Sequence, residues 1–224
     1  MIDDVRMIEV KEDIHADNVK VAQGLRERVA GSKTFLLNLM SAPGSGKTST
    51  ILRTIDELRS RFTFGVLEAD IDSKVDAEKI AAHGIAAVQL RTGGFCHLDA
   101  TMVTQGLDAM DLGALDIVII ENVGNLVCPA EFDTGAIKSV MILSVPEGDD
   151  KPLKYPLMFS VSDVLLINKI DYMSLSDFDI AAARERALKL NPKIEIFEVS
   201  AKTGQGIDAW AAWLEREASL FLGR

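Results

Sequence analysis

The sequence predicts an α/β fold in which a mostly parallel central sheet carries helices on both faces. Apolar runs that suit strands alternate along the chain with segments whose apolar residues recur at helical spacing. Residues 115–120 are almost uninterrupted in their apolar character, as is typical of a central strand buried on both faces. Residues 41–48, Ser-Ala-Pro-Gly-Ser-Gly-Lys-Thr, join an apolar run to a helical segment in the pattern of a phosphate-binding loop. Together these features predict a P-loop NTPase fold.

Strands and helices follow one another in a regular order. Short apolar runs bounded by polar or glycine-containing segments predict strands at 35–40, 63–69, 85–90, 115–120, 140–143, 164–167 and 194–199. Longer segments with helical spacing predict helices at 49–58, 73–83, 98–110, 176–190 and 207–222. The acidic segment 147–150, Glu-Gly-Asp-Asp, lies between two apolar runs. We expect it to be a solvated loop, and a turn that responds to nucleotide is the alternative.

The N-terminal part of the chain predicts a helical extension ahead of a single domain. The chain has 224 residues, of which 48% are hydrophobic, so it can bury a substantial core. Within residues 13–31 the apolar positions recur among charges as in an amphipathic helix; they are Ile14, Val19, Val21, Ala22, Leu25 and Val29. We therefore expect a helical extension over residues 1–32 and a P-loop domain over residues 33–224.

Charge and hydropathy exclude two classes of partner. The formal net charge of -10 argues against nucleic acid, because nonspecific binding to a phosphate backbone depends on clustered Lys and Arg. We also expect no membrane partner: apolar stretches fall short of a membrane span, and residues 1–11 are polar and acidic, unlike a signal peptide. A cytoplasmic protein is the expectation, and in that reducing compartment Cys96 and Cys128 are free thiols or metal ligands.

The glycine-rich segment predicts how a nucleotide triphosphate is held. Small residues let consecutive backbone N–H groups turn toward a phosphate chain, and the following helix adds its positive N-terminus. Lys47 can reach the β- and γ-phosphates, and the Thr48 hydroxyl can hold Mg²⁺. Ser41 stands where the usual first glycine would be, so the backbone there is less free. The alternative is an ordinary strand-to-helix turn. The predicted phosphate-binding residues are Gly44, Ser45, Gly46, Lys47, Thr48 and Ser49.

Two loops in the last third of the chain predict that the base is guanine. Asp171 can accept hydrogen bonds from both N1–H and the exocyclic amino group of guanine, and adenine offers no such pair of donors. The aliphatic part of Lys169 can lie over the base, and a backbone N–H of the second loop can donate to the guanine O6. An exposed charged turn is the alternative for either motif alone. The predicted base-binding residues are Asn168, Lys169, Asp171, Ser200, Ala201 and Lys202.

Acidic residues at two strand ends predict the magnesium side of the site. Glu121 ends a central strand and can hold Mg²⁺ through a water, while Gly124 leaves room for a backbone N–H near the γ-phosphate. Asp70 and Asp72 end another strand, and we expect Asp70 to order the attacking water or the Mg²⁺ shell. Without an assignable glutamine or arginine finger, hydrolysis of GTP is expected to be slow. The predicted catalytic residues are Lys47, Asp70, Glu121 and Gly124, and the predicted magnesium ligands are Thr48, Asp70 and Glu121.

Cys96, His97 and Cys128 form a second candidate site. Cys96 and His97 lie in a loop that leads into a helix, and Cys128 follows Glu121 in the segment that leaves a central strand. Both loops should emerge from one edge of a parallel sheet, which favours metal binding. The alternative is that the cysteines are small buried apolar residues, as free cysteines often are. Thiolate and imidazole suit both Ni²⁺ and Zn²⁺, so the donor atoms do not choose between them.

Four of these motifs together resemble the HypB family of nickel-inserting GTPases of hydrogenase maturation, which belongs to the SIMIBI class. They are residues 41–48, Glu121-Asn122-Val123-Gly124, residues 168–171 and Cys96-His97-Leu98-Asp99-Ala100. The resemblance implies GTP hydrolysis, a homodimer that responds to nucleotide, and nickel or zinc at Cys96, His97 and Cys128. It also implies a HypA-type nickel carrier and the nickel-iron hydrogenase large-subunit precursor as partners.

Three ligands leave the shell of such a metal incomplete, so a water or a second subunit would complete it. We expect the segment from Glu121 to Cys128 to couple nucleotide state to the metal. Two alternatives remain open: a GTP-dependent docking switch, and a urease-type accessory GTPase in which metal only bridges the dimer.

Overall fold

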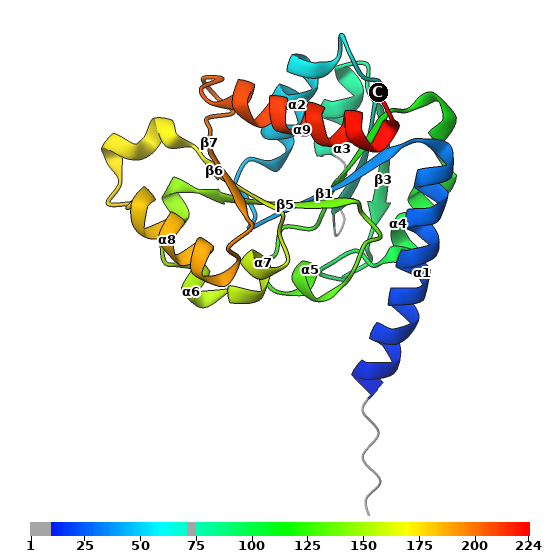
Figure 1. Ribbon diagram of the computed structural model, residues 1–224, viewed down its shortest axis with the longest axis horizontal. Coiled ribbons are helices and arrows are strands. Elements are labelled where there is room, and N and C mark those ends of the chain that lie inside the picture. The colour runs from blue at the N-terminus through cyan, green and yellow to red at the C-terminus, as the bar shows by residue number, and fades with distance from the viewer. Residues whose placement is uncertain (1–9, 71–74) are drawn as a thin grey trace, which may run out of the picture.

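The computed structural model describes residues 10–70 and 75–224 and confirms the predicted α/β fold (Figure 1). The described residues form a seven-stranded sheet in the order β3-β2-β4-β1-β5-β6-β7, and every neighbouring pair is parallel. The strands are β1 Phe35–Ser41, β2 Phe64–Asp70, β3 Ala86–Arg91, β4 Ile117–Glu121, β5 Lys138–Ser144, β6 Val164–Asn168 and β7 Glu195–Glu198. Because β1 lies between β4 and β5, the loop at its carboxyl end lies at the middle of the sheet edge.

Helices cover both faces of this sheet, as the alternation of elements predicts (Figure 1). One face packs against α2 Lys47–Leu58, α3 Val75–Ala82 and α9 Ile207–Leu222. The other face packs against α1 Val10–Ser32, α4 Ala100–Asp108, α7 Pro156–Ser160 and α8 Ile180–Leu190. Strands β1, β4 and β6 are buried along their whole length, which explains why their sequences lack the alternation of a half-exposed strand.

Helix α1 packs on the domain through only some of the apolar residues that were expected to form its buried face. Asn18, Ala22, Leu25 and Val29 are buried at helical spacing, and Leu25 and Val29 join the core around α4. Val19 was expected on this face but is 57% exposed, and Val21 is exposed as well. Both fall off the stripe that the spacing of the buried residues defines. The side chain of Ile14 lies outside the described residues.

Several element boundaries differ from those predicted, for local reasons. The helix predicted at 98–110 begins at Ala100 because the Asp99 carboxylate accepts a hydrogen bond from the Met102 N–H and caps it. The helix predicted from 176 begins at Ile180, capped in the same way by Asp179. Three short α-helices were not predicted, because each is too short to show a helical repeat of apolar residues. Each has a proline in its first turn. They are α5 Cys128–Glu131, α6 Lys151–Lys154 and α7.

Residues 1–9, part of the predicted extension, and residues 71–74, which include Asp72 and the start of the helix predicted at 73–83, lie outside the described residues. Within the parts that are described, no helix has the length together with the apolar character that crossing a membrane requires.

Candidate functional site

The phosphate-binding loop connects β1 to α2 and has the backbone that its glycines allow. Gly44 and Gly46 adopt positive φ angles of 73° and 100°, which favour glycine. At Gly46 a side chain is also excluded by space, because an added Cβ would lie 2.6 Å from the Asn168 amide nitrogen. Helix α2 begins at Lys47, earlier than predicted, so its N-terminus points into the loop.

Lys47 is held at the mouth of this loop by a residue whose role the sequence did not reveal. Its Nζ donates to the Ser41 hydroxyl at 3.2 Å, and Ser41 donates in turn to the Ala42 carbonyl at 2.7 Å. Ser41 is fully buried at the end of β1. Burial lowers the pKa of Lys47, while nearby carboxylates, foremost Glu121, oppose that shift. The departure from glycine at Ser41 therefore gives the lysine a hydrogen-bond partner.

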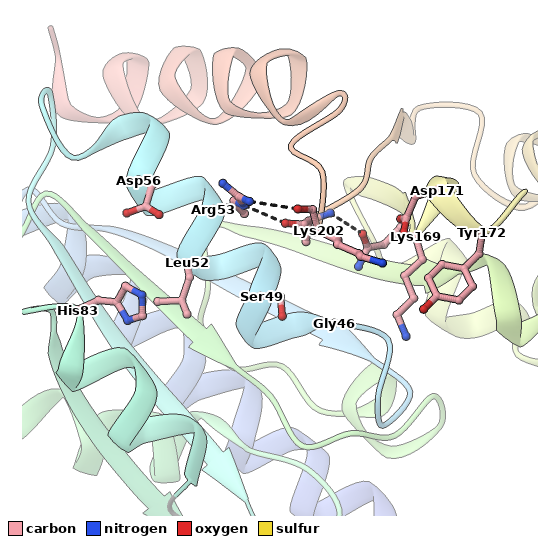
Figure 2. Close-up of a pocket in the computed structure, with 12 residues that line it drawn as sticks. Gly46, Ser49, Leu52, Arg53, Asp56, His83, Lys169, Asp171, Tyr172 and Lys202 are labelled. Atoms are coloured by element: carbon pink, nitrogen blue, oxygen red, sulfur yellow. Dashed lines mark hydrogen bonds between the residues drawn. The ribbon is translucent and has the colours of Figure 1, made fainter.

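The predicted base-binding residues converge beside the phosphate-binding loop (Figure 2). Asn168 donates to the Ser45 carbonyl at 2.8 Å and accepts from the Ala201 N–H at 3.1 Å, so it joins both loops. Lys169, at a left-handed φ of 62°, donates to the Gly44 carbonyl. These residues line a cavity of about 520 Å³ together with Ser49, Asp171 and Lys202.

Two further side chains shape this cavity and were missed in the sequence. Arg53 of α2 donates to the carbonyl oxygens of Ala201 (2.9 Å) and Lys202 (3.1 Å), as Figure 2 shows, and so fixes the second base loop. Tyr172 lines the opposite wall, with the Lys202 ammonium 5.8 Å from its ring centre. A single arginine in a helix carries no sequence signal for such a contact. Tyr172 directly follows the Asn-Lys-x-Asp motif and was recognisable as a neighbour of the base.

On the other side of Lys47 lies a second cavity, of about 340 Å³, with acidic walls. Thr48 donates to Glu121 Oε1 at 2.7 Å, while Glu121 Oε2 is buried and has no hydrogen-bond partner in the part of the chain that the structure describes. Burial raises the pKa of Glu121 to about 7, against the effect of the Thr48 hydrogen bond. Asp70 lines the same cavity at the end of β2. Asp70 and Glu121 therefore face one cavity, while Thr48 lines a neighbouring cavity that Glu121 and Lys47 also line.

Glu68 is an acidic residue of this cavity that was not predicted from the sequence. Its backbone lies opposite Glu121 in the pairing of β2 with β4, it is 4% exposed, and its Oε2 is buried with no hydrogen-bond partner among the described residues. Burial raises its pKa to about 8, and the nearby Glu121 adds to that effect. Glu68 could have been recognised in the sequence, because it is the charged residue within an otherwise apolar run that predicts a strand. Asp76 of α3 also lines the cavity and pairs with Lys79 at 2.8 Å.

Gly124 touches the phosphate-binding loop. A Cβ at this position would lie 3.0 Å from the Pro43 Cα and Cγ atoms, tighter than ordinary contact. The residue lines the acidic cavity together with Pro43 and Lys47. Its lack of a side chain thus allows the segment after β4 to approach the loop, which is the close approach that its position predicts.

The expectation of a solvated loop at 147–150 is wrong for Glu147. Its carboxylate accepts hydrogen bonds from the Ser45 hydroxyl at 2.8 Å, and from the Ser144 N–H and hydroxyl at 2.7 and 2.6 Å. Its second oxygen is buried, without a partner among the described residues. Glu147 therefore ties the end of β5 to the phosphate-binding loop.

Cys96, His97 and Cys128 converge, as predicted from their loops. The two sulfur atoms lie 2.6 Å apart, Cys96 Sγ lies 3.9 Å from His97 Nδ1, and the three candidate ligand atoms are all within 4.8 Å of one another. All three residues are half-buried. The hydrogen bond with Cys96 and burial raise the pKa of the Cys128 thiol. A soft divalent ion bound by two sulfurs and one imidazole fits this cluster.

Ring stacking and two asparagines surround the cluster. The His97 ring stacks on Phe132, with 3.7 Å between ring centres. Asn125 donates to the Cys96 carbonyl at 3.4 Å. Asn122, fully buried, accepts from the Leu98 N–H at 3.2 Å, so the residue next to Glu121 contacts the backbone beside His97. A hydrogen bond therefore links Asn122, which lines the acidic cavity, to the residue that follows His97 in the chain.

Comparison with known proteins identifies the family. Residues 35–198 match the family described as CobW/HypB/UreG, nucleotide-binding domain. The hydrogenase maturation factor HypB of Azotobacter vinelandii is 48% identical over 95% of this chain and 70% of its own length, and that of Escherichia coli K12 is 44% identical over 95% and 73%. A Helicobacter hepaticus relative, 38% identical over 95% of this chain and 88% of its own length, is named a hydrogenase/urease maturation factor.

Solved structures agree with the sequence comparisons. HypB of Helicobacter pylori in complex with nickel matches with a TM-score of 0.86 and 37% identity, over 90% of this chain and 95% of that one. HypB of Archaeoglobus fulgidus matches with a TM-score of 0.85 and 38% identity, over 91% and 99%. The resemblance expected from four short motifs is thus confirmed along the chain. The chain belongs to the HypB family of hydrogenase maturation factors, within the CobW/HypB/UreG nucleotide-binding proteins.

Proposed function

We propose that this protein is a GTP-hydrolysing metallochaperone that binds nickel and helps to insert it into the nickel-iron hydrogenase large-subunit precursor. The observation that carries the proposal is the convergence of Cys96, His97 and Cys128, because Cys128 lies on the segment that leaves Glu121, and Glu121 lines a cavity together with Lys47 of the phosphate-binding loop. Family membership and the likeness to a nickel complex of HypB support the same function.

Guanine recognition is proposed for the cavity around Asp171. The Asp171 carboxylate accepts from the Ser200 hydroxyl at 2.6 Å, which fixes its orientation and leaves its other oxygen for the base. Lys169 and Tyr172 provide the aliphatic and aromatic walls. Asn168 currently binds the Ala201 N–H, an N–H for which a guanine O6 would compete. These groups together distinguish guanine from adenine by their hydrogen-bonding pattern.

The acidic cavity fits a magnesium ion because Glu68 and Glu121 each have a buried carboxyl oxygen that finds no hydrogen-bond partner within residues 10–70 and 75–224. Thr48 and Glu121 would hold the ion, with Asp70 at the rim. Magnesium, when bound with the nucleotide, neutralises charge on the β- and γ-phosphates. Lys47 adds a positive charge at the same phosphates, and the N–H groups at the start of α2 bind the phosphate oxygens.

The proposed hydrolysis uses Asp70 to orient the attacking water. Asp70 ends β2 at the edge of the cavity that Lys47 and Gly124 also line. The segment after β4 approaches the loop at Gly124, so its backbone N–H groups can respond to the γ-phosphate. No arginine lines this cavity among the described residues, and we therefore expect turnover to be slow until a second subunit or a partner completes the site.

Nickel is the proposed cargo of the cysteine cluster, with zinc as a competing ion of similar ligand preference. Because the three ligands are half-buried, a water or a second copy of the chain can supply the remaining ligand, which supports a homodimer. The thiols bind metal only while reduced, as they are in the cytoplasm. A HypA-type carrier and the hydrogenase precursor are the proposed donor and acceptor of the metal.

Coupling between the two sites is proposed to run through Asn122 and the segment that follows it. Glu121 contacts Thr48 at the phosphate-binding loop, and Asn122 accepts from Leu98 beside His97. Asn122 also donates to Asn38 of β1 at 3.1 Å. A shift of this segment with nucleotide state would therefore move the backbone that carries the metal ligands.

Service to urease is the second candidate function. The relatives from two Helicobacter species are named hydrogenase/urease maturation factors, and they match this chain over 92% or more of its length. A docking switch, in which metal only bridges the dimer, is the remaining alternative.

The function is tested by measuring bound nickel, bound zinc and phosphate release from GTP in one preparation. We expect wild-type protein to bind nickel and to hydrolyse GTP slowly, and Cys96→Ala and Cys128→Ala to lose the metal while hydrolysis persists. Ser160→Ala, an exposed change on α7, is the control. If the cysteine variants retain full maturation of the hydrogenase and lose only the dimer, the docking switch is correct and the metallochaperone proposal is wrong.

A further inference from the structure

Helix α1 contacts both metal-bearing segments through one buried side chain. Asn18 is 7% exposed and lies on the face of α1 that packs on the domain. Its Oδ1 accepts a hydrogen bond from the Ala100 N–H, and its Nδ2 donates to the Asp133 carbonyl, both at 2.9 Å. One amide thus joins two segments that are far apart in sequence.

Each of these two backbone groups lies next to candidate metal ligands. Ala100 is the first residue of α4, just after the loop that carries Cys96 and His97. Asp133 follows α5, whose first residue is Cys128, and directly follows Phe132, on which His97 stacks. The Asn18 amide therefore connects the segment that follows Cys96 and His97 to the segment that follows Cys128.

Further contacts fix α1 to the second of these segments. Arg26 donates to both carboxylate oxygens of Asp133, at 2.9 and 2.6 Å, and to the Ala136 carbonyl at 3.2 Å. Gly135 has a positive φ of 75°, and a Cβ there would lie 2.8 Å from Leu25. The segment after α5 thus lies directly on the helix, so α1 can transmit its own position to it.

We propose that Asn18 is a positioning residue for the metal site, which it serves by setting the separation of the loop before α4 from the segment after α5. The proposal rests on the proposed role of Cys96, His97 and Cys128 as nickel ligands. Groups that orient metal ligands from outside the coordination shell typically change affinity 10- to 100-fold when they are removed. By this account α1 is part of the metal site rather than an appendage of the domain.

The test is nickel affinity, measured on the full chain by competition with a chelator, for wild type, Asn18→Ala and Val29→Ala. Val29 is fully buried on the same helix, so its truncation weakens the packing of α1 but keeps the Asn18 amide. We expect Asn18→Ala to bind nickel about 10-fold more weakly and to change its nickel–thiolate absorption. Val29→Ala should bind as wild type does. Equal affinity of Asn18→Ala and wild type, or an equal loss in both variants, would overturn the proposal.

A second variant keeps the test decisive if Asn18→Ala does not fold. Asn18→Asp preserves the acceptor for the Ala100 N–H but loses the donor to the Asp133 carbonyl, and we expect it to bind nickel more weakly than wild type as well. Wild-type affinity in Asn18→Asp would contradict the bridging role. A wild-type chain that binds no nickel at all would instead overturn the proposed function, so the two failures are distinguishable.

Discussion

Asn168 and Cys96 show that the two proposed sites, the nucleotide pocket (the nucleotide end) and the cysteine cluster (the metal end), are held in place differently. Asn168 is buried and binds the backbone of both neighbouring loops, so the nucleotide end is fixed by hydrogen bonds before any ligand arrives. Cys96 is half-buried, and its sulfur contacts only the other two members of the metal cluster among the hydrogen bonds described. The comparison indicates a preorganised nucleotide pocket and a metal pocket whose geometry follows the loops that carry it.

The difference suits a protein that must hold one ligand and release another. A fixed pocket favours binding of the nucleotide, because the conformational entropy of its side chains is already lost when the protein folds. A cluster assembled from two loops can change its separation when either loop moves. Asn122 contacts both regions, so it is the place where the two behaviours meet.

Removing Lys47 should break the nucleotide end with the largest effect. Lys47→Ala deletes the charge at the β- and γ-phosphates, and we expect phosphate release from GTP to fall by about 10²- to 10³-fold. Nickel bound without nucleotide should be unchanged, since Lys47 is not one of the candidate metal ligands. Lys189→Ala, an exposed change on α8, is the matched control. Normal hydrolysis in Lys47→Ala would contradict the assignment of this loop.

Changing Asp171 should sharpen the account of base selection. Asp171→Asn replaces an acceptor by a donor, which favours the C2 carbonyl of xanthine over the amino group of guanine. We expect affinity for guanine nucleotides to fall about 10- to 100-fold and affinity for xanthine nucleotides to rise. Asp177→Asn, the same change at a nearby exposed position, should alter neither. Unchanged selectivity in Asp171→Asn would remove Asp171 from the base site.

Glu147 gives the smallest expected effect and tests how rigid the nucleotide end is. Glu147→Ala removes the side-chain acceptor of the Ser144 N–H and leaves the Ser45 hydroxyl with only the Ala42 carbonyl, at 2.8 Å, among its two acceptors in the described residues. We expect the free energy of unfolding to fall by about 1–3 kcal/mol and nucleotide affinity to weaken less than in Asp171→Asn. Denaturant unfolding measures the free energy of unfolding, and nucleotide titration measures the affinity. Glu185→Ala, a change at an exposed position of α8, is the control. A nucleotide effect larger than that of Asp171→Asn would refute this ranking.

The sequence predicted the sheet and the nucleotide residues because each motif is a contiguous segment with a mechanism of its own. The spacing of Gly44, Gly46 and Lys47 predicts a phosphate-binding loop from local conformation and charge alone, so no distant contact has to be known. The unbroken apolar runs predicted buried parallel strands, and β1, β4 and β6 are buried throughout.

The parts that were missed depend on contacts between distant segments. Arg53, Glu147 and Asn18 each act through backbone or hydroxyl groups more than 80 positions away, and no local pattern marks them. Glu147 illustrates the failure most clearly, because an acidic turn ordinarily faces water, whereas this one is fixed to Ser45. Glu68 differs, since a charge within an apolar strand was visible and its burial follows from the strand's central position.

The most direct test of coupling is nickel affinity and coordination in the GDP-bound protein and in protein bound to a nonhydrolysable GTP analogue. If the segment from Glu121 to Cys128 connects the two ends, affinity should differ by about 5-fold or more between the two states, with a change in the nickel–thiolate spectrum. Equal affinity and an identical spectrum in both states would show that the nucleotide does not control the metal.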